Sequence, residues 1–177
     1  MPISFNVKAD IKQVTRSLNR WEKRAVPAAA NAALNKAAAK VRTTISSDLA
    51  KEMGIKVGEV KKQINVRRSN FTTLTAKLIA RGRRWNIIRF KAKELKTALK
   101  ASPWNKARKW KTGFIGNQGR TAFLRLSRKR LDIKPLRGPG MASEFVRDRA
   151  VALMQRISGS EFLKNFRHEL KRRIARL

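Results

Sequence analysis

The sequence predicts an α+β fold, arranged as a single domain over residues 1–177. Two observations indicate this class. Strand-like alternation occurs at the N-terminus and through the middle of the chain, whereas helical periodicity occurs in a long alanine-rich segment and again at the C-terminus. Strands and helices therefore occur in separate runs, which is typical of α+β rather than alternating α/β proteins.

The N-terminal third is predicted to contain one strand and three helices. Residues 3–7 alternate apolar and polar side chains, as a half-buried strand does. An apolar stripe over residues 10–21 predicts a helix that ends before Pro27. Proline suits the first turn of a helix, so a new helix is expected from Pro27 to Gly54, followed by a short helix over residues 57–64.

The expected helix from Pro27 to Gly54 carries a stripe of small and aliphatic side chains. Alanine allows a neighbouring helix to approach closely, so we interpret this stripe as a helix-packing surface. Its partner is a helix of this chain or of a neighbouring subunit. The stripe residues are Ala30, Ala33, Leu34, Ala37 and Val41.

The middle of the chain is predicted to be an antiparallel β region. Strands are expected near residues 71–80 and 85–90, and the glycine-containing turn at residues 116–119 predicts a hairpin over residues 114–126. Residues 91–113 have little apolar periodicity and many lysines. They are expected to form a long basic loop or extended arm that a partner orders.

Two helices are predicted at the C-terminus. Ser143 can cap the first, whose apolar face extends to Ile157. Ser158 and Glu161 have the spacing of a capping box, so a second helix is expected to begin there and to continue to Leu177.

The charge of the chain is large and unevenly distributed. The formal net charge is +33, and residues 60–140 contain 24 basic and two acidic residues. Self-repulsion at this density destabilises a compact state unless a polyanion or an acidic protein surface neutralises it. The sequence therefore predicts one of these two partners for the middle of the chain.

Basic clusters in this region are the candidate contacts to DNA or another polyanion. No zinc-finger spacing or helix-turn-helix signature accompanies them, so contacts to phosphates rather than to base edges are expected. The candidate residues are Arg81, Arg83, Arg84, Arg89, Lys106, Arg108, Lys109, Lys111, Arg125, Arg128, Lys129 and Arg130.

Two tryptophans are interleaved with one of the basic clusters. Trp104 and Trp110 flank the sequence between Asn105 and Lys109. Such a pattern is compatible with a stacking platform for bases or with docking on a neighbouring subunit, and we favour docking. Both residues are therefore assigned, with the alanine stripe, to a packing or subunit interface.

Residues that carry enzyme chemistry are scarce in this sequence. There is no cysteine, His168 is the only histidine, and Glu94 and Asp132 each lack a second carboxylate nearby. The turns at residues 116–119 and 138–140 do not match a phosphate-binding loop. We expect no catalytic residues, no metal and no cofactor, and the sequence shows no signal peptide or membrane span.

The chain resembles the minor tail protein Z family of tailed bacteriophages and their prophages. The resemblance rests on "RSLNRWEKRAVPAAANAALNKAAAKVRTTI", "KEMGIKVGEVKKQI", the basic β region and "LDIKPLRGPGMAS", and it is sharpest over Ala25–Arg42. It spans nearly the whole chain, and its motifs are structural, so it transfers no catalytic residue.

The resemblance implies a structural virion protein, assembled in the host cytoplasm. It implies a tail-completion or neck subunit at the head-proximal end of a long non-contractile tail, between the tail terminator and the head connector. It also implies a homo-oligomeric ring, with six copies matching tail symmetry, around the passage for phage DNA. From the charge alone, the alternative is a ribosomal or nucleoid-type protein that binds nucleic acid without sequence specificity.

Overall fold

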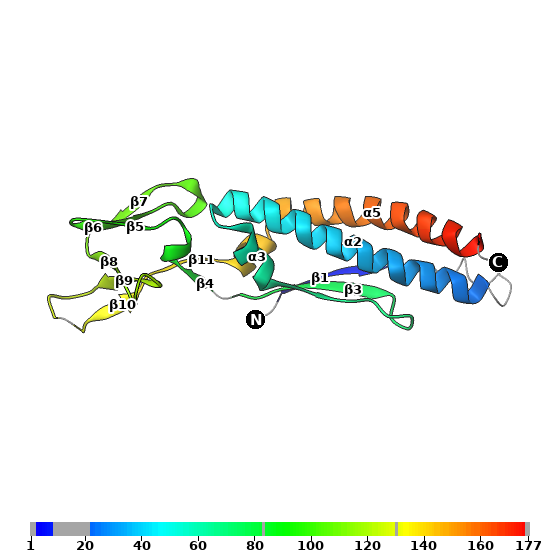
Figure 1. The fold of residues 1–177 in the computed structure, drawn as a ribbon, viewed down its shortest axis with the longest axis horizontal. Helices are drawn as coiled ribbons and strands as arrows, with labels where there is room; N and C mark the ends of the chain where they lie inside the picture. The colour runs from blue at the N-terminus through cyan, green and yellow to red at the C-terminus, as the bar shows by residue number, and fades with distance from the viewer. Residues whose placement is uncertain (1–2, 9–21, 83, 130, 176–177) are drawn as a thin grey trace.

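The computed structural model describes residues 3–8, 22–82, 84–129 and 131–175, and it confirms the α+β class. Figure 1 shows an elongated molecule in which two long helices lie over a small sheet at one end and short strands occupy the other end. The buried side chains of both ends belong to one continuous hydrophobic cluster. The helical end and the β end are therefore packed against each other.

Two long helices form the body of the helical end. Their bounds are α2, Glu22–Met53, and α5, Asp148–Ile174. Polar contacts join Lys36 to Glu169 and Asp48 to Arg149, so the helices run antiparallel. Figure 1 shows them side by side over most of their length.

The alanine-rich stripe of α2 is buried within the single chain. Its five residues have no exposed surface, and Ala29, Ala38 and Ile45 extend it along the helix. The small side chains lie where α2 packs against α5 and the sheet. A helix partner from the same chain therefore covers the stripe.

We expect Ala37→Leu to lower the free energy of unfolding by about 1–3 kcal/mol, because three extra carbon atoms enter a fully packed site. Urea denaturation followed by circular dichroism measures the change. Ala39→Leu is the matched control, because Ala39 is exposed on the same helix. Equal stability of the two variants would show that the α2 stripe is not closely packed.

A three-stranded antiparallel sheet packs under α2. Its strands are β1 (Ile3–Lys8), β2 (Ile64–Arg67) and β3 (Thr75–Ala80), and β3 is in the centre. The first expected strand is thus present, and the expected short helix is α3, Val57–Gln63. Ala76, Leu78 and Ala80 are buried on one face of β3, as their alternation predicts.

The expected strand over residues 71–80 begins later than predicted. The Asn70 side chain accepts hydrogen bonds from the backbone N–H and the hydroxyl of Thr73, both at 2.7 Å. This local turn holds the chain before β3 out of the sheet.

The other end of the molecule consists of short strands and single helical turns. These are β4 (Arg84–Asn86), η1 (Ile87–Arg89), β5 (Lys93–Leu95), β6 (Ala98–Ala101), η2 (Pro103–Asn105), β7 (Arg108–Trp110), β8 (Gly113–Gly116), β9 (Thr121–Arg125), β10 (Ile133–Pro135), β11 (Arg137–Gly140) and α4 (Met141–Phe145). They form the antiparallel sheets β5-β6-β7, β10-β9-β8 and β11-β4. We call residues 84–140 the β region.

Two predicted elements of the β region are confirmed in part. The hairpin over residues 114–126 is present as β8 and β9. The strand expected over residues 85–90 ends at Asn86, because the Asn86 side chain accepts a hydrogen bond from the Ile88 N–H at 3.1 Å and starts the single turn η1.

Residues 91–113 are a folded sheet, not the loop or arm that the sequence predicts. They form β5-β6-β7, and Leu99 and Ala101 of β6 are almost completely buried. Each strand has three or four residues, so alternation covers too few positions to be seen in the sequence. The packing of Leu99 against Gly113 is a tertiary contact that the segment's composition does not reveal.

The helix boundaries near Pro27 also differ from the prediction. α2 already begins at Glu22, so Pro27 lies in its second turn instead of starting a new helix. Proline removes one helical hydrogen bond there, while buried Val26 and Ala30 on either side keep the helix packed. The helix expected over residues 10–21 lies outside the described residues.

One continuous helix replaces the two expected at the C-terminus. Ser158 does not cap a helix, because its hydroxyl donates to the Gln155 carbonyl at 3.0 Å inside α5. The break occurs instead between α4 and α5, and Ser143 lies within α4, where its hydroxyl donates to the Gly140 carbonyl at 3.1 Å. Serine hydroxyls can bond within a helix as well as cap one, so the capping pattern is ambiguous.

Candidate polyanion-binding surface

The basic residues predicted to contact a polyanion are exposed wherever the structure describes them. Arg83 and Arg130 lie outside the described residues. The exposed ones are Arg81, Arg84, Arg89, Lys106, Arg108, Lys109, Lys111, Arg125, Arg128 and Lys129. They are spread over the β region and the segment that precedes it, on several short strands and turns rather than on one helix.

Among the described residues, the acidic side chains that form ion pairs lie outside the β region. Glu169, Glu144, Glu52 and Asp48 form ion pairs with cations of α2 and α5 or of the turn between α4 and α5. Within the described part of the β region, the ion pairs are confined to Arg89, whose guanidinium lies 2.8 Å from Glu59. The other described cations there have no carboxylate of a described residue within 4.0 Å.

The hairpin β8–β9 fixes the position of one of these cations. The rings of Phe114 and Phe123 stack with centroids 5.7 Å apart, and the Arg125 guanidinium lies 5.3 Å from the Phe114 centroid. Arg128 and Lys129 follow in the exposed turn between β9 and β10. Cations on a turn of this kind can reach an extended polyanion without a groove for bases.

Asn86 joins the two small sheets that carry these cations. Its side-chain oxygen accepts a hydrogen bond from the Ala122 N–H at 2.9 Å, and its side-chain nitrogen donates to the Ala122 carbonyl at 3.0 Å. Ala122 has no exposed surface. These two hydrogen bonds therefore take the place of strand pairing between β4 and β9, and they hold the two sheets in one orientation.

A pocket lies where β4, β7, β11 and η2 meet. Its volume is about 530 Å³, and Arg84, Arg108, Trp104 and Trp110 are among its lining residues. The structure thus brings two predicted cations and both predicted tryptophans together. Arg137 also lines this pocket, and sequence reasoning missed it because it stands alone between prolines, outside any basic cluster.

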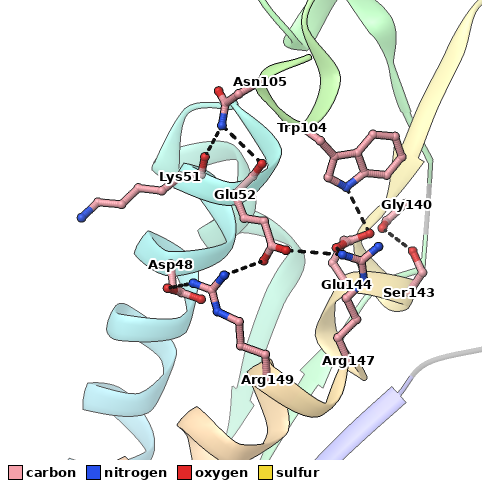
Figure 2. A network of polar contacts seen from close by, with 10 residues as sticks. All are labelled: Asp48, Lys51, Glu52, Trp104, Asn105, Gly140, Ser143, Glu144, Arg147 and Arg149. Carbon is pink, nitrogen blue, oxygen red and sulfur yellow. Dashed lines mark hydrogen bonds and ion pairs between the residues drawn. The ribbon is translucent and has the colours of Figure 1, made fainter.

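Trp104 packs against its own chain. Its indole N–H donates to the Glu144 carboxylate at 3.3 Å (Figure 2). The next residue, Asn105, donates from its side chain to the Lys51 carbonyl at 2.8 Å, at the end of α2. Both residues have positive φ, near 52° and 57°, so η2 is a tight turn held at both sides by side-chain contacts.

An ion-pair network lies next to the β region, at the end of the helix pair. Arg147 lies 3.3 Å from Glu52 and 3.1 Å from Glu144, and Arg149 lies 2.9 Å from Asp48 (Figure 2). The network thus connects the end of α2 with α4 and the start of α5. Trp104, which lines the pocket, donates a hydrogen bond to the same Glu144, so this side of the pocket is connected to the helix pair.

The candidate residues for other chemistry are dispersed. His168 is exposed on α5, and the Glu94 carboxylate accepts a hydrogen bond from the Ile115 N–H at 3.2 Å. Among the residues that the structure describes, no three His, Cys, Asp or Glu side chains are grouped to hold a metal ion. None of the described helices is both long and apolar enough to cross a membrane.

Comparison with known proteins gives one family. The family model of prophage minor tail protein Z (GPZ) matches residues 9–177, which is nearly the whole chain. Comparisons with curated proteins and with solved structures gave no match. The family is one of structural proteins of the phage tail, which places the protein in the virion. The chain belongs to the prophage minor tail protein Z family.

Proposed function

We propose that this protein is a tail-completion subunit at the head-proximal end of the tail, where it helps join the tail to the head. Membership of the tail protein Z family supports a structural role in the tail. The shape supports a junction protein, because a rigid helix pair and a basic β region lie at opposite ends of one elongated chain (Figure 1).

The proposed assembly is a ring of identical subunits around the passage for phage DNA. Six copies would match the symmetry of a tail, and the neighbours above and below are the tail terminator and the head connector. A closed ring requires each subunit to present two different surfaces to its neighbours.

The observation that carries this proposal is the unneutralised charge of the β region. Its described cations other than Arg89 have no carboxylate of a described residue within 4.0 Å, and a compact ring would bring several such regions together. Repulsion between them is offset if they face DNA phosphates. Phosphate contacts need no sequence readout, which suits a passage through which a whole genome moves.

A reconstruction of assembled tails tests the placement. We expect density for a ring of this protein at the head-proximal end, with the β region facing the channel. A different location in the particle, or a β region facing outward, would contradict the proposal. A protein that stays monomeric with the tail terminator and head connector, yet binds duplex DNA, would favour the nucleic-acid-binding alternative.

Replacing Arg125, Arg128 and Lys129 with alanine should weaken duplex DNA binding uniformly across sequences. If all three contact phosphates, the slope of log K against log salt should become less steep by about 2–3. Fluorescence anisotropy over a range of salt concentrations measures the slope.

The matched control replaces Lys164, Arg167 and Lys171 on α5, which removes the same charge from the helical end. The control should keep most of the wild-type slope. Equal losses in the two triple variants would show that DNA binding follows net charge and not the hairpin of the β region.

A further inference from the structure

The pocket between η2, β7 and β11 is lined by tryptophans as well as arginines, whereas binding of phosphates alone requires only the cations. Three guanidinium groups and two indoles line it, from Arg84, Arg108, Arg137, Trp104 and Trp110. Its volume of about 530 Å³ has room for a few side chains, whereas a DNA duplex lies against wider surfaces. This combination of arginines and tryptophans suits a ligand that has both anionic and apolar groups.

The three arginines supply the anion-binding part of the pocket. They come from β4, β7 and β11, which are separate in sequence and meet only in the folded chain. Within the described residues, none of the three has a carboxylate within 4.0 Å, although ion pairs of this kind are frequent at the helical end. A planar guanidinium binds a carboxylate through two parallel hydrogen bonds, so this site suits carboxylates well.

The two tryptophans supply a fixed apolar part. Trp104 is held by its hydrogen bond to Glu144. Trp110 pairs with Leu99 in the β6–β7 ladder, and a side chain at Gly113 would lie 3.1 Å from the Trp110 Cβ. Both indoles are partly buried and remain in contact with solvent at the pocket. Positions that are already fixed lose little conformational entropy when a ligand binds.

We propose that this pocket is a docking site for an acidic peptide segment of another virion protein, with carboxylates on Arg84, Arg108 and Arg137 and an aromatic side chain against the indoles. Tryptophan and arginine are the residues that dominate protein–protein binding energies. A base of duplex DNA reaches an indole only after it is unstacked, which costs a few kcal/mol, whereas a peptide side chain enters directly. Charge complementarity and the shape of the pocket thus favour a peptide, and this inference does not depend on DNA contacts elsewhere.

A short synthetic peptide of alternating glutamate and phenylalanine tests the proposal. Without tryptophan of its own, it allows the protein's tryptophan fluorescence to report binding, and calorimetry gives the affinity independently. We expect saturable binding that is at least tenfold weaker for the R84A/R108A/R137A variant. The peptide with glycine in place of phenylalanine should also bind at least tenfold more weakly, although its charge is the same.

The control variant replaces Lys164, Arg167 and Lys171 with alanine and thus loses the same charge far from the pocket. It should bind the peptide within threefold of the wild type, and circular dichroism should show both triple variants folded. Equal weakening in both variants, or equal affinity for the glycine peptide, would overturn the proposal by showing attraction to net charge only. Tighter binding of a thymidine tetranucleotide, lost in the same arginine variant, would overturn it in favour of a nucleotide site.

Trp104→Phe gives a second test in case the arginine variant does not fold. It keeps an aromatic ring but removes the hydrogen bond to Glu144. We expect threefold to tenfold weaker peptide binding in a folded protein. Unchanged binding would contradict a fixed Trp104 as part of the site.

Discussion

Replacing Phe90 with alanine should lower the free energy of unfolding by about 3–5 kcal/mol, the range for loss of a fully buried aromatic side chain. Phe90 has no exposed surface and directly follows η1 in the β region. Its ring meets Trp85 edge to face, with centroids 6.5 Å apart. Among the described residues, Phe90 and Phe145 are the largest fully buried side chains.

The packing around Phe90 leaves little room for relaxation. A Cβ added at Gly138 would lie 2.7 Å from the Phe90 ring, so the backbone of β11 already contacts the ring. Removal of the ring therefore leaves a cavity lined in part by the β11 backbone, which cannot collapse as freely as side chains can. Because Gly138 and Ile87 also line the pocket, the same variant should bind the acidic peptide more weakly.

Urea denaturation measures the loss, and Phe71→Ala is the matched control. The Phe71 side chain is 63% exposed, so its removal should change the stability by no more than about 0.5 kcal/mol. The double variant F90L/G138A should be more stable than the sum of its single variants predicts, because the added methyl group occupies space that the smaller side chain vacates. Strict additivity would show that Phe90 and Gly138 do not share one packed site.

The sequence predicts the elements that have long periodic patterns. The residues of α2 after Pro27 show many repeats of the helical period, and the glycine-containing turn at residues 116–119 marks the hairpin over residues 114–126, so both elements follow from the sequence alone. The buried stripe of α2 also follows from its spacing. Boundaries depend instead on single side chains that can bond in two ways, such as Ser158, Asn70 and Asn86.

The rest of the site depends on contacts between distant residues. Residues 91–113 fold because Leu99 and Ala101 meet a core built by other segments. Arg137 joins Arg84 and Arg108 only through the pairing of β4 with β11 and the position of β7. A sequence of basic residues indicates that an anion binds, but the convergence of three strands decides which cations share one pocket.

Replacing Glu169 with alanine should lower the free energy of unfolding by about 2–4 kcal/mol, somewhat less than for a fully buried ion pair because its partners reach solvent. The Glu169 side chain is 2% exposed and lies between α5 and α2, 2.7 Å from the Lys36 ammonium and 2.8 Å from the Arg172 guanidinium. Without the carboxylate, these two cations and Arg173 repel one another across the helix pair.

Lys36→Ala is the control that separates this effect from simple loss of one ion pair. Lys36 is 49% exposed, and its removal leaves Glu169 paired with Arg172 and Arg173. We expect a loss of at most about 1 kcal/mol for that variant. Equal losses in the two variants would show that the buried carboxylate does not organise the three cations.

The pH dependence of stability gives a stricter test of the Glu169 site. The hydrogen bond from Lys36, followed by that from Arg172, lowers the pKa of Glu169 below its ordinary value of 4.5. A carboxyl group with a lowered pKa in the folded state contributes stability above the unfolded value, and this contribution is lost as pH falls through the folded value. The stability difference between the wild type and Glu169→Gln should thus be constant above about pH 6 and should shrink below pH 4.5, because the protonated carboxyl group resembles the amide. Urea denaturation of both proteins at a series of pH values measures this difference, and a difference that stays constant down to about pH 3 would contradict ionic stabilisation by Glu169.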